Sequence, residues 1–119
     1  MYIKNIKELK KNLRARYRRY REKMNAEQKI RLDASIQCRL LTLEEYLHAE
    51  TLFIYVSKPI EVDTLAVINA ALANHKRVAV PRCVEGTREM EFYLIDSLSQ
   101  LSPQAFGVLE PVREKCERL

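Results

Sequence analysis

The sequence predicts an α/β domain in which two N-terminal helices lead into a mostly parallel β-α-β sheet. Two observations predict it. Apolar residues recur every three or four positions in roughly the first third of the chain, and short β-branched or aromatic runs separated by a helical segment follow. With 119 residues, 47% of them hydrophobic and only 2 of them glycine, the composition is globular and excludes a flexible or low-complexity chain.

Helical periodicity dominates the N-terminal part. A first helix is expected from about Ile3 to Met24, because its apolar residues fall on one stripe. This stripe holds Ile6, Leu9, Leu13, Tyr17, Tyr20 and Met24. Asn25 followed by Gln28 has the spacing of a helix N-cap and predicts a second helix, whose apolar face holds Leu32, Ile36, Leu40 and Leu43. A short helical turn at 43–48 is expected to close this region.

Extended apolar runs begin after residue 50. Thr51–Val56 is apolar, aromatic or β-branched almost throughout, which is typical of a central strand covered on both faces. Asp63 and Thr64 can cap a helix that leads to a second strand, Arg77–Val80, and Pro81 is expected to end that strand. These segments make up the predicted parallel β-α-β unit.

The last third of the chain contains one more expected strand, Met90–Ile95. On it, Met90 and Phe92 share one face, as part of the core or as the wall of a pocket. Residues 97–111 are expected to form a largely irregular connection, and 112–119 a short helix or a frayed end. We therefore expect one domain over residues 1–119; the family resemblance given below implies that its sheet is incomplete at the C-terminus.

Positive charge is concentrated in the first predicted helix. The net charge is +5, but residues 4–23 hold ten Lys or Arg and two Glu, which gives +8, while the rest holds 11 basic and 14 acidic residues, which gives −3. One face of the helix carries Lys7, Lys10, Arg14, Arg18 and Arg21. Such a face is either a solvated surface or a binding site for a polyanion such as a triphosphate. Nucleic-acid binding is disfavoured, because no base-reading module accompanies it.

The sequence gives little indication of a metal site, a catalytic triad or a membrane segment. The three cysteines are widely separated and lack metal-ligand spacing, so reduced thiols are expected. No catalytic triad or metal-ligand set is predicted. Neither a membrane-spanning run nor a signal peptide is present, and we expect a cytoplasmic protein without a membrane partner.

Ligands of open α/β sheets bind beyond the carboxyl ends of the strands, which directs attention to two residues. Glu61 follows the first predicted strand, and its carboxylate could accept two hydrogen bonds from an amino-heterocycle or be an ordinary surface group. Arg82 follows the second strand, where it could contact phosphate or a ligand carboxylate, or pair with Glu61 or Asp63.

Several motifs occur in a specific order along the chain. They are Lys10-x-x-Leu13-Arg14, Met24-Asn25-Ala26-Glu27, Leu40-Leu41, Tyr55-Val56-Ser57, Glu61-Val62-Asp63-Thr64, Val80-Pro81-Arg82, Met90-x-Phe92 and Phe106-Gly107-x-x-Glu110-Pro111. In this order and spacing the sequence resembles the N-terminal part of the 5-formyltetrahydrofolate cyclo-ligase family.

The resemblance implies an ATP- and Mg²⁺-dependent ligase that closes 5-formyltetrahydrofolate to 5,10-methenyltetrahydrofolate and releases ADP and phosphate. It implies ATP contacts at Lys10, Lys11, Asn12, Leu13 and Arg14. It also implies contacts with the folate substrate at Val56, Glu61, Arg82 and Met90. The expected state is a monomer.

One element of the family pattern is missing. Family members carry a glycine-rich motif of the form G-x-G-x-G-Y-Y-D that serves ATP and magnesium, whereas the two glycines of this sequence, Gly86 and Gly107, do not form one. We therefore expect a truncated cyclo-ligase domain, with an exposed sheet edge, whose activity on its own is open. The alternative is a non-catalytic folate- or nucleotide-binding domain, or an RNA-binding interaction domain that uses the basic first helix.

Overall fold

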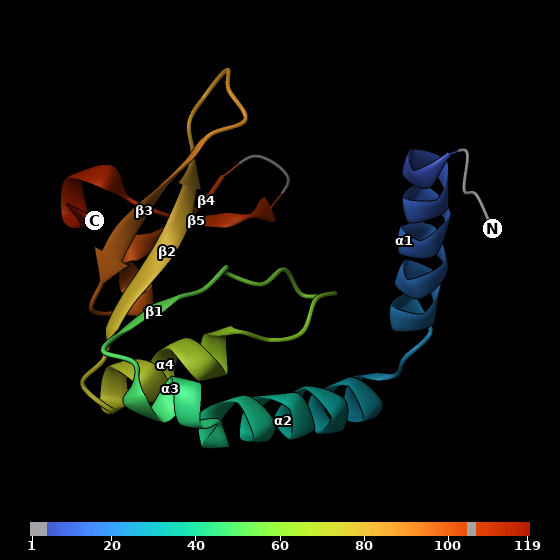
Figure 1. Ribbon diagram of the computed structural model, residues 1–119, viewed down its shortest axis with the longest axis horizontal. Coiled ribbons are helices and arrows are strands. Elements are labelled where there is room, and N and C mark those ends of the chain that lie inside the picture. The colour runs from blue at the N-terminus through green and yellow to red at the C-terminus, as the bar shows by residue number, and fades with distance from the viewer. Residues whose placement is uncertain (1–4, 105–106) are drawn as a thin grey trace.

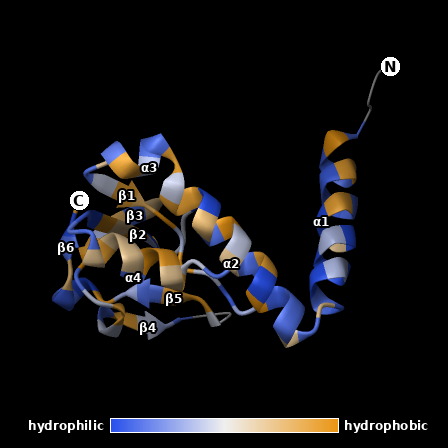
Figure 2. Cartoon of the chain, turned by 90° about the horizontal axis from the view of Figure 1, so that it is seen from below, coloured by the Kyte–Doolittle hydropathy of each residue, from blue (hydrophilic) through white to orange (hydrophobic). Residues whose placement is uncertain are grey.

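The computed structural model describes residues 5–104 and 107–119, which form one separate helix and an α/β body. The helices are α1 (Ile6–Glu22), α2 (Ala26–Thr42), α3 (Glu44–His48) and α4 (Leu65–Ala73). Figure 1 and the perpendicular view in Figure 2 both show α1 standing away from the remaining elements. We call residues 26–119 the body.

Side-chain caps fix the starts of both N-terminal helices. Asn5 Oδ1 accepts a hydrogen bond from Glu8 N at 3.0 Å at the start of α1. At α2, Gln28 N donates to Asn25 Oδ1 at 2.8 Å and Asn25 N donates to Gln28 Oε1 at 3.2 Å, a reciprocal capping box. The predicted cap at Asn25 is confirmed, and both predicted helices are present. Ile3, where the first helix is expected to begin, lies outside the described residues.

The main sheet is mixed, with the strand order β1-β2-β3-β6. Its strands are β1 (Thr51–Phe53), β2 (Arg77–Cys83), β3 (Met90–Ile95) and β6 (Glu117–Arg118). β1 and β2 are parallel, but β3 is antiparallel to both β2 and β6. The prediction of a mostly parallel sheet is therefore wrong. The physical reason is that residues 84–89 form a hairpin, whereas a parallel crossover needs about a dozen residues or more.

Two predictions about single strands are also wrong. β1 is three residues long and lies at one end of the strand order rather than in its centre, so Phe53 is 55% exposed. The buried strand is β2, in which Val78 and Val80 are fully buried. β2 also continues through Pro81 to Cys83. Because the pairing with β1 ends at residue 79, a proline beyond that point interrupts no ladder on the β1 side.

The region expected to be irregular contains a second sheet. β4 (Leu101–Pro103) and β5 (Leu109–Pro111) pair antiparallel after a 3₁₀ turn, η1 (Leu98–Gln100). After β5, a second 3₁₀ turn, η3 (Arg113–Lys115), leads into β6, which pairs with β3 at Tyr93 and Leu94. The C-terminal residues thus combine the expected helical turn with a strand that covers part of the edge of β3.

The core collects side chains from α3, α4, β2, β3 and the loop that follows β1. Its buried residues are Tyr46, Val56, Ile68, Ala71, Val78, Val80 and Ile95. None of the residues of α1 is buried. Within the described residues, no helix has the length and apolar character needed to cross a membrane.

Candidate substrate and phosphate sites

The loop between β1 and α4, residues 55–64, is closed by two reciprocal hydrogen bonds. Ser57 N donates to Thr64 Oγ1, and Thr64 N donates to Ser57 Oγ, both at 2.9 Å. The Thr64 hydroxyl donates in turn to Tyr55 O at 2.8 Å, and Thr64 is only 6% exposed. These bonds satisfy buried polar groups and hold the two ends of the loop together.

The two residues predicted to cap α4 have different roles. Asp63 does cap the helix, because its Oδ1 accepts from Leu65 N at 2.9 Å. Thr64 occupies the N-cap position but makes no side-chain cap bond, since its hydroxyl closes the loop instead. Gln37 of α2 donates from Nε2 to Asp63 O at 2.8 Å, so the loop is also tied to α2.

Glu61 lies at the turn of this loop, where the backbone orients its carboxylate. Lys58 N donates to Glu61 Oε1 at 2.8 Å, and Glu61 N donates to Lys58 O at 2.9 Å. The side chain is partly buried. The carboxylate of Glu61 is thus held in one orientation by the backbone, unlike that of an ordinary surface glutamate.

Glu61 lines a cavity of about 490 Å³ between the loop, α2 and β5. Three carboxylates and two lysines line this cavity: Asp33, Glu61, Asp63, Lys29 and Lys58. Apolar side chains complete the wall, among them Ile30, Leu65 and Leu109. Its size and mixed lining suit a small organic molecule with a flat apolar part and several hydrogen-bonding groups.

Asp33 is a site residue that the sequence reading missed. It is 8% exposed, accepts a hydrogen bond from Lys29 Nζ one turn earlier in α2, and accepts from Asp63 N at 3.3 Å. A signal existed, because the pair has the i, i+4 spacing of a helical ion pair and Asp33 adjoins the apolar face of α2. The contact with Asp63, 30 residues away, had no signal in the sequence.

The charged side chains of the Glu61 cavity also affect the hydroxyl of Tyr55. Burial raises the pKa of its hydroxyl above the ordinary value of 10.0, and the nearby carboxylates of Glu61 and Asp33 raise this pKa further. The cations Arg21 and Lys29 act in the opposite direction. The phenol therefore stays protonated at neutral pH and can donate a hydrogen bond at this end of the sheet.

The other predicted folate contacts lie away from this cavity. Val56 is 5% exposed and belongs to the core beneath the loop. Arg82 donates from Nη1 to Pro111 O at 2.9 Å, and so holds β5 rather than pairing with Glu61. Met90 is 57% exposed and opposes Cys83 at the hairpin end of β3. Of the four predicted folate contacts, Glu61 is thus the one that lines this cavity among the described residues.

Glu110 is a second buried carboxylate that the sequence reading did not select. It is 9% exposed, and its Oε2 accepts from Cys83 N at 2.8 Å. The hydrogen bond between the Cys83 thiol and Glu110 is the main reason why the pKa of this thiol is raised, with burial second. Together with Arg82, Glu110 attaches β5 to the end of β2.

The predicted ATP contacts lie on α1. Lys11, Asn12 and Arg14 border a shallow hollow of about 500 Å³ on this helix, together with Lys7. Lys10 is exposed but does not border the hollow, and Leu13, 41% exposed, belongs to the apolar stripe. Glu8, whose Oε2 accepts from Asn5 Nδ2 at 3.1 Å, borders the same hollow. The three cationic side chains outnumber this one carboxylate, and such a cluster fits an anionic polyphosphate.

The basic hollow and the Glu61 cavity do not meet. Figure 1 shows α1 apart from the loop that follows β1. The nearest link is a smaller cavity of about 170 Å³ at the C-terminal end of α1, where Arg21 and Met24 approach Ile60 and Val62. Lys10 and Arg14 lie two to three helical turns before Arg21.

Magnesium, which the family resemblance implies, does not fit the described residues. Across residues 5–104 and 107–119, no group of three or more His, Cys, Asp or Glu side chains is placed to hold a metal ion. Asp33, the most buried carboxylate of the cavity, is already bound by Lys29 and Asp63 N. We therefore assign no step of the chemistry to a metal held by these residues.

Comparison with known proteins decides the family. The model of the 5-formyltetrahydrofolate cyclo-ligase family matches residues 6–119. The chain belongs to this family. The resemblance seen in the ordered motifs is thus confirmed, although Phe106 of the last motif lies outside the described residues. No curated protein sequence matches the chain.

A solved structure confirms the fold class of this cyclo-ligase family member. The NMR structure of Aquifex aeolicus 5,10-methenyltetrahydrofolate synthetase is similar, with a TM-score of 0.76 and 27% sequence identity. The similarity covers 93% of this chain and 55% of that chain. This chain therefore spans little more than half the length of the synthetase.

Proposed function

We propose that this chain serves the cytoplasmic, ATP-dependent cyclisation of 5-formyltetrahydrofolate to 5,10-methenyltetrahydrofolate, with release of ADP and phosphate. The family match over residues 6–119 is the observation that carries the proposal. Two surfaces of suitable chemistry support it. They are the mixed cavity at Glu61 and the basic hollow on α1.

The Glu61 cavity is the proposed folate site. The carboxylate, oriented by Lys58 N, can accept hydrogen bonds from the N–H groups of a pterin ring. Ile30 and Leu109 offer apolar surface to the ring, and Lys58 offers a cation to a substrate carboxylate. Val56 supports the loop from the core, and Arg82 and Met90 are proposed as more distant folate contacts.

The α1 cations are the proposed ATP site. Lys10, Lys11 and Arg14 supply donors for the phosphates, Asn12 adds an amide, and Leu13 offers apolar surface beside them. Arginine can engage two phosphate oxygens at once, whereas lysine acts as a compact charge. This division of donors suits a triphosphate.

In the proposed reaction, the formyl oxygen attacks the γ-phosphorus of ATP, and ADP leaves. N10 then attacks the activated formyl carbon. The carbon–oxygen bond breaks with its electron pair leaving on phosphate, and the proton of N10 is lost, which gives the methenyl product. The protein mainly positions the two substrates and stabilises the negative charge on the transferred group.

Substrate binding tests the folate site directly. Titration calorimetry with 5-formyltetrahydrofolate should show that Glu61→Gln weakens binding about 10- to 100-fold, because a charged acceptor is lost while the amide oxygen can still accept from Lys58 N. Glu85→Gln, on the exposed hairpin, is the matched control and should bind like the wild type. Equal affinity in all three proteins would remove Glu61 from the site.

Turnover tests the reaction. With ATP and magnesium supplied, formation of methenyltetrahydrofolate is followed by its near-ultraviolet absorbance. Lys10→Gln with Arg14→Gln should abolish this ATP-dependent turnover. If the chain binds folate and ATP without turnover, it is a non-catalytic folate- and nucleotide-binding domain.

RNA binding is a second candidate function, because the exposed helix α1 holds eight basic and two acidic residues, a net charge of +6. Fluorescence anisotropy with a labelled single-stranded RNA distinguishes the two functions. Tight binding that weakens steeply with salt and is lost in the Lys10→Gln and Arg14→Gln protein, without folate binding, would favour RNA.

A further inference from the structure

One side of α2 carries three polar side chains in a row. They are Lys29, Asp33 and Gln37, which follow one another at helical i, i+4 spacing and therefore lie one above another. Asp33 is buried and the other two are partly buried, whereas most residues of α2 are exposed. Burying polar groups is unfavourable unless each has a hydrogen-bond partner, so the partners of this row indicate its role.

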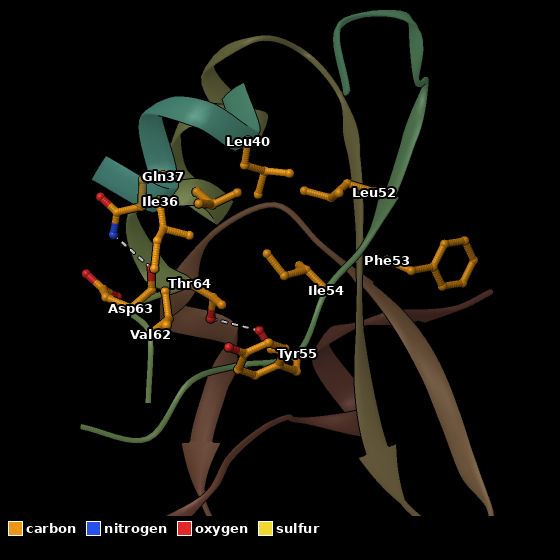
Figure 3. Close-up of a pocket in the computed structure, with 11 residues that line it drawn as sticks. Ile36, Gln37, Leu40, Leu52, Phe53, Ile54, Tyr55, Val62, Asp63 and Thr64 are labelled. Carbon is orange, nitrogen blue, oxygen red and sulfur yellow. Dashed lines mark hydrogen bonds between the residues drawn. The ribbon is translucent and has the colours of Figure 1, made fainter. Parts of the chain in front are cut away.

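Asp33 and Gln37 hold the same residue of the loop 55–64. The amide of Asp63 donates to Asp33 Oδ2 at 3.3 Å, and Gln37 Nε2 donates to Asp63 O at 2.8 Å. Figure 3 shows the Gln37 side chain extending from α2 to Asp63. Within the part of the chain that the structure describes, these are the two hydrogen bonds that join α2 to the loop, and we call them the α2 clamp.

Lys29 supports the clamp through Asp33. Its Nζ donates to Asp33 Oδ2, the same oxygen that accepts from Asp63 N. The two side chains of this ion pair are 27% and 11% exposed. The ammonium group offsets the cost of burying the Asp33 carboxylate. The row thus presents a charged acceptor and a neutral donor to the two backbone groups of Asp63.

The clamp fixes a distance that the bonds between Ser57 and Thr64 do not fix. Those bonds join the two ends of the loop to each other. The Glu61 cavity, however, lies between the loop and α2, which contributes Lys29 and Ile30 to the opposite wall. The separation of the two walls therefore depends on the clamp.

The clamp lies close in sequence to the carboxylate that faces the cavity. Glu61 precedes Asp63 by two residues, and its turn is closed by Lys58 N, which donates to Glu61 Oε1, and by Glu61 N, which donates to Lys58 O. Movement of Asp63 away from α2 would carry this turn with it. A binding group that is held in place before the ligand arrives lowers the cost of ordering the site on binding.

We propose that Asp33 and Gln37 are positioning residues for the substrate. By holding Asp63 against α2, they set the position of the Glu61 carboxylate relative to Ile30 on the facing wall, and so the width of the gap that receives the pterin ring. Neither side chain has to touch the substrate. The inference rests on the proposed folate site at Glu61 and names what determines its shape.

Binding of 5-formyltetrahydrofolate, measured by titration calorimetry, tests the role of Gln37. Gln37→Met keeps a side chain of similar length but removes the donor, and it should weaken binding about five- to tenfold. Ser35→Met is the control, because Ser35 is neutral and exposed on α2, and it should bind like the wild type. In a Glu61→Gln background, Gln37→Met should weaken binding by less than about twofold further, because the group that it positions has already lost its charge.

Two outcomes of this cycle would overturn the proposal. They are wild-type affinity in Gln37→Met, and losses from Gln37→Met and Glu61→Gln that multiply fully in the double variant. If Glu61→Gln alone binds like the wild type, the folate site itself is wrong, which distinguishes failure of the proposed function from failure of the clamp.

A pair of changes at Asp33 separates the clamp from the ion pair. Asp33→Asn and Asp33→Leu both remove the charge, but the asparagine retains an oxygen that can accept from Asp63 N. Asp33→Asn should therefore bind 5-formyltetrahydrofolate at least about fivefold more tightly than Asp33→Leu. Equal affinities would exclude a positioning role for Asp33.

Amide hydrogen exchange followed by NMR tests the clamp without substrate. In Gln37→Met, the amides of Lys58 and Glu61 should exchange at least about fivefold faster, whereas the amides of the buried strand β2 should keep their rates. Unchanged exchange in the turn would overturn the proposal, as would equal acceleration throughout the chain, which is the result expected of a purely structural side chain. This readout decides the matter even if the wild type does not bind 5-formyltetrahydrofolate, a result that would reject the proposed function instead.

Discussion

Ser57 and Thr64 hold each other by two hydrogen bonds, the amide of each donating to the hydroxyl of the other at 2.9 Å. This pairing closes the loop that carries Glu61, so the position of the proposed folate-binding carboxylate depends on two neutral side chains. The hydroxyl of Thr64 also donates to Tyr55 O, so it both accepts and donates a hydrogen bond. Polar side chains, together with the packing of Val56 in the core, therefore set the geometry of this loop.

Replacing Thr64 with valine should destabilise the protein by about 2 kcal/mol, because the isosteric side chain of this buried residue can neither accept from Ser57 N nor donate to Tyr55 O. Urea unfolding measures the change. Thr42→Val is the control, since the Thr42 hydroxyl is exposed and bonds only to carbonyls of its own helix, and it should cost less than about 0.5 kcal/mol. Equal losses in the two variants would contradict a special role for Thr64.

Tyr55 should make the stability of the protein fall at high pH. Its pKa is raised in the folded state, first by burial and then by Glu61 and Asp33, so its stabilising contribution is complete below pH 10.0 and is lost as the pH rises through the folded-state pKa. The free energy of unfolding of the wild type should therefore fall more steeply above about pH 10 than that of Tyr55→Phe. Spectrophotometric titration should show one tyrosine with a raised pKa, absent from the variant. Parallel pH profiles would contradict this coupling.

Lys29 and Asp33 form an ion pair, so replacing Asp33 alone should destabilise the protein more than replacing both residues. Asp33→Leu should cost about 2–3 kcal/mol in unfolding free energy, because it leaves a largely covered ammonium group and Asp63 N without their acceptor. Adding Lys29→Met should recover part of that loss, since no uncompensated charge then remains. A matched pair on α1, Arg18 and Glu22, is exposed and should show a coupling below about 1 kcal/mol. A double variant no more stable than Asp33→Leu would contradict the pairing.

Features encoded by neighbouring residues were predictable from the sequence. The capping box of Asn25 and Gln28 needs only a spacing of three residues, and the family motifs needed only their order. The position of Glu61 after the first strand was predictable for the same reason. Its Lys58 contact is also local.

Features that depend on distant contacts were not predictable. Whether a strand lies in the centre or at the edge is decided by its partners, and the apolar sequence Thr51–Val56 cannot specify that β1 has a neighbour on one side only within the described sheet. The burial of Asp33 and Glu110 depends on amides 30 and 27 residues away. Periodicity predicted the apolar stripe on α1, but it could not predict that none of the residues of this helix is buried.

Glu110 should control the reactivity of Cys83. The hydrogen bond to its carboxylate, followed by burial and by the negative charge, raises the pKa of this thiol above 9.0 and so suppresses the reactive thiolate. Glu110→Gln should lower the pKa towards its ordinary value, and iodoacetamide should then alkylate Cys83 faster at any pH below 9.0. Cys38, exposed on α2, provides the internal reference, because its rate should not change. An unchanged Cys83 rate would mean that Glu110 does not raise the pKa of this thiol, whereas a faster rate at both cysteines would indicate general loosening of the fold.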